Sequence, residues 1–410
     1  MKEPMDLDDV RRRLVQERLR RARGDEAAPE ASRGPLADVE SAEFDSLREQ
    51  FGSIDDVWPL SPLQLGLVFQ VGVDADATEL YTVRTVVEVD RVLDDDRIRR
   101  ALQSVVDTTA AMRTAFVTPD DTAPAQVVLS AVQAPLTVVD LRACPASEVD
   151  DRWSRILADD RALSFDIAAP PLFRVTLVHL PGGVDRLLTT YWFGCFDGGS
   201  SALLVARVLE QHDENGTPVP PDHGYREYLR WLASRDRAES EQAWQRYFGD
   251  IDSPTSVAAE ATRGDGSPRR IERRVTAAVS DALDLHARRS GSTLFTVLAA
   301  AWASVLMRVV GRSDVVFGTA VAGRPINVAG SDTAIGAFIS TVPIRVTAGG
   351  FDSVTDVAAR VQDQRLDLMP HDTLGLGGIQ QAIGAGALFD TLLVLRNAGG
   401  PAGRQESTSA

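Results

Sequence analysis

The residues of this sequence that could take part in chemistry are few, and the densest group lies between Tyr191 and Asp197. It contains a phenol, a thiol and a carboxylate, at Tyr191, Cys195 and Asp197. A thiol needs a base or a cationic neighbour to become a nucleophile, and no histidine lies near Cys195 in the sequence. We therefore interpret Cys195 as a small buried residue, and a nucleophile is the less favoured alternative. Asp197 precedes Gly198 and Ser200, a pattern typical of a turn or of a helix cap.

The five histidines are scattered and show no metal-ligand spacing, so we predict no metal site. His371 is kept as a catalytic candidate, although such a histidine is more often packed or on the surface. His179 shares a strand face with Phe173 and Leu177, which indicates a core histidine with its hydrogen bonds satisfied. The two cysteines are too few for a disulfide framework.

Length and charge set further limits. At 410 residues the chain is too long for one ordinary core, which predicts two packed lobes and a tail. The formal charge of −16 would repel a phosphate backbone, so we do not expect a nucleic-acid partner. An acidic protein partner would also be repelled and would need a local basic patch. We find no apolar run of membrane-spanning length and no secretory signal, so we expect a cytoplasmic protein without a membrane partner.

The elements that must position these residues alternate between strands and helices, which predicts a mixed α/β (α+β) fold. Period-two patterns predict strands at 81–90, 173–180, 186–193, 315–321, 339–347 and 389–395. Helical patterns predict helices at 95–106, 202–212 and 292–310, and the last is apolar nearly all round, as expected of a buried helix. The Pro-Gly-Gly at 181–183 predicts the turn that joins two neighbouring strands. Alternation along the second of them places Tyr191 and Phe193 on one face and Trp192 on the other.

Several short segments occur in a characteristic order across about residues 54–397. They are WPLSPLQ at 58–64, MRTAF at 112–116, YREY at 225–228 with Trp231, FGTAVAGRP at 317–325, IGAFISTVPIR at 335–345, His371 with LGL at 374–376, and FDT at 389–391. Each is weak alone. Together they resemble the condensation domains of nonribosomal peptide synthetases.

The resemblance implies two chloramphenicol-acetyltransferase-like lobes arranged as a V, with a tunnel between them. Phosphopantetheine arms of carrier proteins would enter this tunnel as substrate tethers, and the chain itself would bind no cofactor. The implied partner is a peptidyl or aminoacyl carrier protein or another synthetase subunit.

The sequence departs from the family at its catalytic motif, His-His-x-x-x-Asp-Gly. The aligned stretch runs from Trp192 to Gly198: Asp197 and Gly198 match, but Trp192 and Phe193 replace the histidines. A phenyl ring can neither accept nor position a proton, which removes an effect that typically contributes about 10²–10⁴-fold. Both rings are also bulkier than imidazole and would narrow a tunnel. In a second motif, Thr108-Thr109 replaces the usual Arg-His.

The resemblance also implies structural and tunnel-lining positions. Asp197 would pair with a motif arginine, for which the candidates are Arg113, Arg324 and Arg345. Further positions of this kind are Ser61, Gln64, Ser200 and Ser340, the last standing where asparagine is usual.

The predicted organisation has four parts: 1–53, 54–220, 221–397 and a disordered tail at 398–410. Residues 6–23 are predicted to form an amphipathic helix, followed by a flexible linker at 24–38. This helix either packs on its own domain or docks to another synthetase subunit. Family members usually continue beyond the strand at 389–395, so we expect a second lobe that is trimmed or a shortened version of the domain.

Two functions fit these observations. The favoured one is a non-condensing platform that binds a carrier protein or recruits a tailoring enzyme. Glycopeptide synthetases use condensation-like domains in this way, although those retain the first histidine. The alternative is an active acyltransferase that joins a carrier-bound acyl group to an amine or alcohol by positioning alone. Heterocyclising relatives also lack the histidines, but they carry an aspartate where this chain has Trp192.

Overall fold

The computed structural model describes residues 36–37, 41–74, 77–118, 123–214, 219–249, 251, 253–258, 271–350, 352–395 and 406–407. By its contacts the chain separates into residues 1–35 and residues 36–410, and the fold below is that of the second unit. The helix predicted at 6–23 and most of the linker predicted at 24–38 lie outside the described residues.

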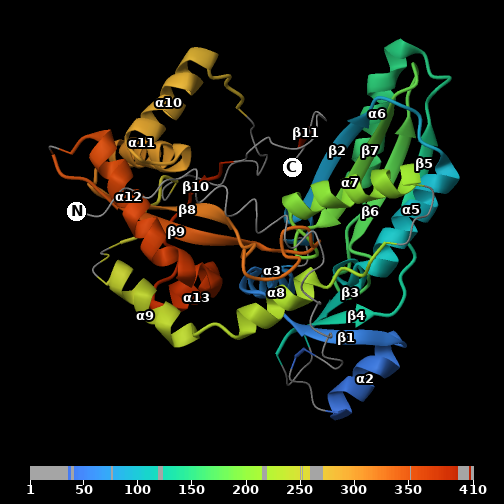
Figure 1. The fold of residues 1–410 in the computed structure, drawn as a ribbon, viewed down its shortest axis with the longest axis horizontal. Coiled ribbons are helices and arrows are strands. Elements are labelled where there is room, and N and C mark those ends of the chain that lie inside the picture. Colours follow the sequence, from blue (N-terminus) through green and yellow to red (C-terminus); the bar gives the residue numbers. More distant parts are fainter. Residues whose placement is uncertain are drawn as a thin grey trace, which may run out of the picture. The chain divides into compact units, whose positions relative to one another are not determined.

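The first half of this unit contains a five-stranded sheet in the order β11-β2-β7-β6-β5 and a three-stranded sheet in the order β1-β4-β3 (Figure 1). Its strands are β1 (Ile54–Pro59), β2 (Thr82–Val89), β3 (Thr114–Val117), β4 (Ala125–Leu129), β5 (Leu136–Asp140), β6 (Phe173–His179) and β7 (Asp185–Trp192). Its helices are α2 (Ser41–Phe51), α3 (Pro62–Val73), α4 (Ala77–Leu80), α5 (Asp95–Thr108), α6 (Val149–Arg161) and α7 (Gly198–Glu214), with short 3₁₀ turns η1 (Ala110–Arg113) and η2 (Ala146–Glu148).

The hairpin of β6 and β7 leads into the motif. The two strands are antiparallel, with Phe173 opposite Tyr191 and His179 opposite Asp185. Gly182 and Gly183 in their turn have φ angles of 86° and 83°, the left-handed region that glycine tolerates best. The predicted hairpin is therefore confirmed. The second strand begins and ends one residue earlier than predicted, since β7 runs from Asp185 to Trp192 and Phe193 already lies in a turn.

Helices α5 and α7 pack with this sheet to form the largest core cluster of the first half. The amphipathic pattern of α5 explains its position, since Ile98, Leu102 and Val105 recur at helical spacing and are all buried. Helix α7 begins at Gly198, earlier than the predicted Ala202, because Asp197 caps it.

The second half contains a three-stranded sheet, β10-β8-β9, covered by helices on both faces (Figure 1). Alternation along β8 assigns the faces: Val315 and Phe317 pack with α11 and α12, whereas Val316 packs with α9 and α13. The elements are α8 (Gly224–Ala233), α9 (Arg237–Phe248), α10 (Ala277–Arg289), α11 (Leu294–Val310), β8 (Asp314–Ala322), β9 (Ile339–Thr347), α12 (Val354–Leu368), η3 (Met369–Leu374), α13 (Gly375–Ala382) and β10 (Leu392–Leu393).

Two predictions about the second half are wrong. Helix α11 is not buried all round: Val305 and Val309 are 49% and 57% exposed, because the helix packs against the sheet on one side only. The strand predicted at 389–395 is only Leu392–Leu393, parallel to β8. In the tail, Glu406–Ser407 form strand β11, antiparallel to β2. The other residues of 398–410 lie outside the described part, so the disordered tail stays a prediction.

The two halves share a core cluster around α8. Tyr225, Tyr228 and Leu229 pack with Trp58 and Val128, although the predicted boundary would assign α8 to the second half. That boundary at 220, like the V arrangement of the lobes, stays a prediction.

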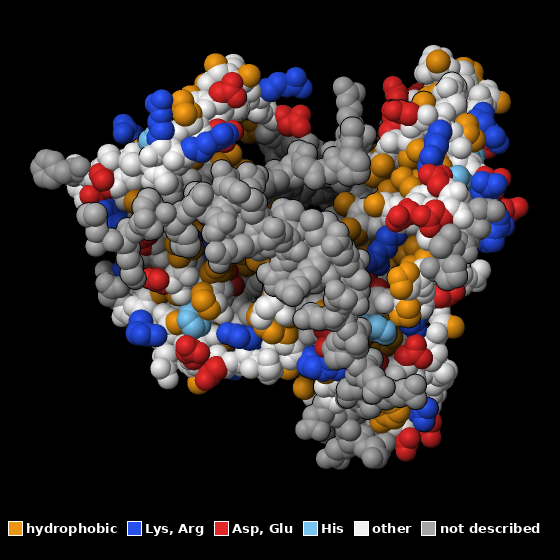
Figure 2. Space-filling view, in the orientation of Figure 1, with side chains coloured by type: hydrophobic (Ala, Val, Ile, Leu, Met, Phe, Trp, Pro, Cys, Tyr) orange, Lys and Arg blue, Asp and Glu red, His pale blue; other side chains and the backbone are white. Residues whose placement is uncertain are grey.

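The described surface carries charges of both signs (Figure 2). In the described part of the chain, no single helix is long and apolar enough to cross a membrane. Helices α10 and α11 together have the length and apolar composition of a span, but the pair is bent by 106°.

Candidate functional site

Trp192 belongs to the core of the first half. Its side chain has no exposed surface, and its ring meets that of Phe116 edge-on, with 4.9 Å between the ring centroids. The indole also covers Gly194: a Cβ placed on Gly194 would lie 2.1 Å from the ring. The prediction that Trp192 narrows a tunnel is therefore wrong, because the indole points into the core.

Phe193 stands at the position of the second motif histidine and is partly buried against the same core. Its backbone N–H donates to the Tyr81 carbonyl at 2.8 Å. Neither Trp192 nor Phe193 offers a group that changes its charge, so neither can relay a proton.

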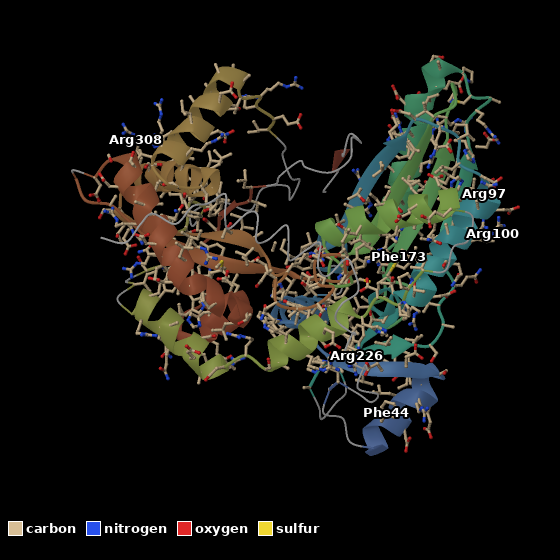
Figure 3. The ribbon with its side chains drawn as sticks, viewed as in Figure 1. Phe44, Arg97, Arg100, Phe173, Arg226 and Arg308 are labelled. Atoms are coloured by element: carbon tan, nitrogen blue, oxygen red, sulfur yellow. The ribbon has the colours of Figure 1, made fainter. Side chains whose placement is uncertain are left out.

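Cys195 is buried, and its Sγ donates to the Ala111 carbonyl at 3.3 Å. Burial raises the pKa of the thiol, which disfavours the thiolate needed for nucleophilic attack. The interpretation of Cys195 as a small buried residue is confirmed. Its neighbour Phe196 stacks on Tyr191 at 4.4 Å between centroids and also contacts Phe173 of β6, which Figure 3 labels.

Asp197 acts as a structural acceptor. Its Oδ1 accepts the N–H of Ser200 at 2.8 Å and so caps α7. Its Oδ2 accepts the N–H groups of Phe338 and Ile339, at 3.0 and 3.2 Å, from the segment that leads into β9. The carboxylate thus joins the two halves, and both of its oxygens are occupied by backbone donors.

Arg324 is the candidate arginine that lies beside Asp197. Its Nη2 is 3.7 Å from Asp197 Oδ1 and donates to Ser200 Oγ at 2.8 Å. Its Nη1 donates to the carbonyls of Ser331 and Ala334, and its guanidinium lies over the Phe338 ring at 4.1 Å. Arg324 is therefore held by several partners at once, and burial lowers its pKa.

The other two candidate arginines lie elsewhere, which corrects the prediction. Arg113 pairs with Asp55 at 2.9 Å and also donates to the Leu129 carbonyl. Arg345 pairs with Asp314 at 2.7 Å at the far end of β9.

Ser61 and Gln64 position the motif turn from α3. They form a capping box at the start of the helix, in which each side chain accepts the other residue's backbone N–H. Gln64 is fully buried, and its Nε2 donates to the Gly194 carbonyl at 2.9 Å and to Gln126 at 3.0 Å. In this chain, the segment at 58–64 therefore holds the motif turn through Gln64.

Ser340 and His371 contact other parts of the second half. Ser340 is paired with Val321 of β8 and lies beside Gly375 at the start of α13. His371 Nδ1 is 3.2 Å from Ser240 Oγ, and its carbonyl accepts the indole N–H of Trp244. His371 is thus packed against α9, as we expected for a histidine that is packed and not catalytic.

His179 is confirmed as a core histidine. It is 1% exposed, and its two ring nitrogens lie 2.8 Å from carboxylates of Asp185 and Asp95. Burial alone would lower its pKa, but the hydrogen bonds and the two negative charges outweigh burial and raise it.

Asp222 is a joining residue that the sequence reasoning missed. Its carboxylate pairs with Arg207 of α7 at 2.9 Å and accepts the N–H of Ile335 at 3.0 Å. Its position two residues before the start of α8, in a segment predicted to be a lobe boundary, is the signal that could have identified it. Nearby, Arg226 of α8 pairs with Asp56 of β1 at 2.5 Å (Figure 3).

Two of the cavities lined by described residues have volumes of about 250 and about 400 Å³. The first lies between the start of α3, the α8–α9 turn and η3, and the second lies on α5 beside Thr108. No residue from Trp192 to Gly198 lines either one. In the same described part, no cluster of histidine, cysteine and acidic side chains could hold a metal ion.

The hairpin runs into a helix capped by Asp197, and the same carboxylate joins the second sheet. This mixed α/β arrangement is the chloramphenicol-acetyltransferase-like fold of the solved condensation domains that resemble it. The family model of the condensation domain matches residues 54–410. A linear gramicidin synthase of Brevibacillus parabrevis is 30% identical over 359 residues, covering 84% of this chain and 7% of that protein. Vanchrobactin synthetase VabF of Vibrio anguillarum is 29% identical over 355 residues, covering 86% of this chain and 12% of that protein.

Solved structures show the same fold. The first condensation domain of the calcium-dependent antibiotic synthetase superposes with a TM-score of 0.69 at 22% identity, over 86% of this chain and 84% of that one. The starter condensation domain of rhizomide synthetase gives 0.71 at 19% identity, over 86% and 79%. This chain belongs to the condensation-domain family of nonribosomal peptide synthetases. It spans only a small part of the length of the gramicidin and vanchrobactin synthetases that it matches, 7% and 12% respectively.

Proposed function

We propose that this chain is a condensation-type domain that does not itself catalyse condensation, and that it serves as a platform which binds a carrier protein or recruits a tailoring enzyme. The observation that supports this most directly is the packing of Trp192. The first histidine position has become part of the hydrophobic core, and the second is a phenyl ring.

The neighbouring groups do not replace the missing base. Cys195 is buried with a raised pKa, and Asp197 accepts backbone N–H groups through both oxygens. His371 bonds to Ser240 on α9. A general base must lie within hydrogen-bond reach of the proton it removes, and none of these side chains meets that condition at the motif turn.

The alternative is an acyltransferase that works by positioning. The intact scaffold around the motif favours it: Gln64 still holds the Gly194 carbonyl, and Arg324 still stands beside Asp197. Orientation of two tethered reactants can lower a barrier by several kcal/mol without a proton relay. The reactants would be carried on phosphopantetheine arms of carrier proteins, and the chain itself would hold no cofactor. In both proposals we place the protein in the cytoplasm.

One assay separates the two proposals. The protein is mixed with donor and acceptor carrier proteins loaded with aminoacyl groups, and peptide transfer is followed by intact mass. A family member with both motif histidines is the positive control, and carriers alone set the background. Transfer at background supports the platform; transfer well above background overturns it.

A restoring variant, Trp192→His with Phe193→His, adds a second test. We expect no gain in transfer, because the indole that would be removed fills the core around Phe116 and leaves a cavity there. Carrier binding should be unchanged, and circular dichroism checks that the variant is folded. Strong transfer by this variant would show that the missing histidines alone silence the domain.

A further inference from the structure

Helix α10 is the least packed long helix of the second half. Ala287 is its one buried residue. The extended segment before it, residues 271–276, is exposed throughout. Apolar side chains stand out along this stretch: Ile271 is 78% exposed, Val275 59%, Val279 49% and Leu285 47%. Contiguous exposed apolar side chains on a soluble domain usually mark a site of interaction.

The outer side of α10 has the pattern of a surface made for another helix. Ala278, Ala282, Leu285 and Arg289 are spaced by four, three and four residues, so they follow one face of the helix. All four are exposed. Two alanines in line allow a second helix to come close, and Leu285 supplies an apolar contact between them and the arginine.

Arginines flank this face at both ends. Arg273 and Arg274 precede the helix, and Arg288 and Arg289 end it; among the described residues none of the four forms an ion pair. Arg288 and Arg289 complement the negative end of the helix dipole, but Arg273 and Arg274 have no such explanation. The acidic residues of the stretch are Glu272, Asp281 and Asp284. The four arginines outnumber them by one, so the net charge of residues 271–289 is slightly positive in a chain of charge −16. Figure 2 shows arginine or lysine side chains around α10, together with hydrophobic atoms and some acidic side chains.

We propose that the outer face of α10, together with residues 271–276, is a docking surface for an acidic helix of a partner protein, namely a carrier domain. The inference rests on the proposed platform function, because an acidic carrier needs a local basic patch on this acidic chain. An acidic helix complements the four arginines of this surface, whereas the same surface of a second copy would bring the same arginines and be repelled.

The size of the surface sets the kind of complex. With 13 residues at about 1.5 Å each, α10 offers a contact about 20 Å long. At a helix width of about 10 Å, such a contact covers roughly 200 Å². This area is smaller than the standard interface of about 800 Å² per partner, so the complex should be weak and should exchange rapidly. Such exchange suits a carrier that visits several domains in turn.

The test compares charge-reversal variants on two exposed helices. Arg288→Glu with Arg289→Glu, and separately Leu285→Asp, change the proposed surface. Arg152→Glu with Arg155→Glu on α6 is the matched control, since both arginines are exposed and lie in the other half. Binding of purified phosphopantetheinylated carrier domains from the same synthetase is measured by fluorescence anisotropy at low and at physiological salt. Melting curves confirm that each variant is folded.

We expect the α10 variants to weaken binding by about tenfold or more, with a reduced salt dependence, and the α6 control to stay within about twofold. A photoreactive residue at position 285 should crosslink to the carrier, and one at the exposed Leu163 should not. Equal binding by the α10 variants and the wild type overturns the docking surface but leaves the platform proposal standing. If the wild type binds no carrier, both fail.

Discussion

Gly194 shows how tightly the altered motif is packed. The ring of Trp192 fills the space that any side chain at position 194 would need. Gln64 then fixes the turn by donating to the Gly194 carbonyl. Tryptophan at the first histidine position therefore requires glycine at position 194. The core around the motif is repacked, and Trp192 is not an isolated substitution.

This coupling can be measured. Gly194→Ala should destabilise the protein by about 1–3 kcal/mol, because the new methyl overlaps the indole. In a Trp192→Leu background the overlap is relieved, so the second change should cost at least about 1 kcal/mol less. Urea unfolding of the four proteins of this cycle gives the coupling. Purely additive free energies of unfolding would show that the ring does not set the identity of residue 194.

The His179 cluster makes the stability depend on pH. Its pKa is raised in the folded state, so its contribution is fully present below the ordinary value of 6.5 and is lost as pH rises through the folded value. His179→Gln should therefore cost about 1–3 kcal/mol at pH 6, and progressively less as pH rises above the folded pKa. Unfolding free energies across pH 6–9 test this. The exposed His223→Gln is the control and should show no such trend; a constant cost for His179→Gln would contradict the assignment.

At the scale of elements, prediction from the sequence worked best where pattern and packing agree. The hairpin of β6 and β7 was predictable, because alternation is regular and Pro-Gly-Gly permits the left-handed turn. Helix α11 was predicted to be buried because its composition is apolar all round, and Val305 and Val309 show that composition alone cannot report whether a partner covers the second face. The short β10 follows from its pairing with β8, a long-range contact that no local pattern carries.

Gln64 tests how an element holds the site. Gln64→Ala removes the side-chain donor to Gly194 and Gln126 in a fully buried place and should cost about 1–3 kcal/mol. Gln70→Ala on the exposed side of the same helix is the control and should cost less than about 0.5 kcal/mol. Thermal and urea unfolding compare the two. Equal costs would mean that helix propensity, and not the bond to the motif turn, explains the effect.

At the scale of the whole molecule, Asp197 and Asp222 tie the two halves together. Asp197 reaches Phe338 and Ile339, and Asp222 reaches Ile335. Three arginines were possible partners for Asp197, since each lies in a motif, and only the tertiary structure selects Arg324. Asp222 carried no family motif, so its role depended entirely on contacts distant in sequence.

Asp197→Ala should loosen this connection. Three backbone donors lose their acceptor, so we expect a loss of about 2–4 kcal/mol and a broader calorimetric transition as the halves unfold less cooperatively. The exposed Asp159→Ala serves as the control and should leave the transition unchanged. A variant that melts as sharply as the wild type, at the same temperature, would remove Asp197 from its joining role.

The placement of Asp222 has a consequence for anyone who builds chimeras from related synthetases. Its N–H donates to the Thr108 carbonyl, its carboxylate accepts from Ile335, and Gly224 lies so close to Gly330 that a side chain on Gly224 would force movement. A crossover at residue 220 would take Asp222 from one parent, and both Thr108 and Arg207, the ion-pair partner of Asp222, from the other. Grafts that inherit residues 108, 222–224 and 330–335 from one parent should fold in higher yield than grafts that divide them.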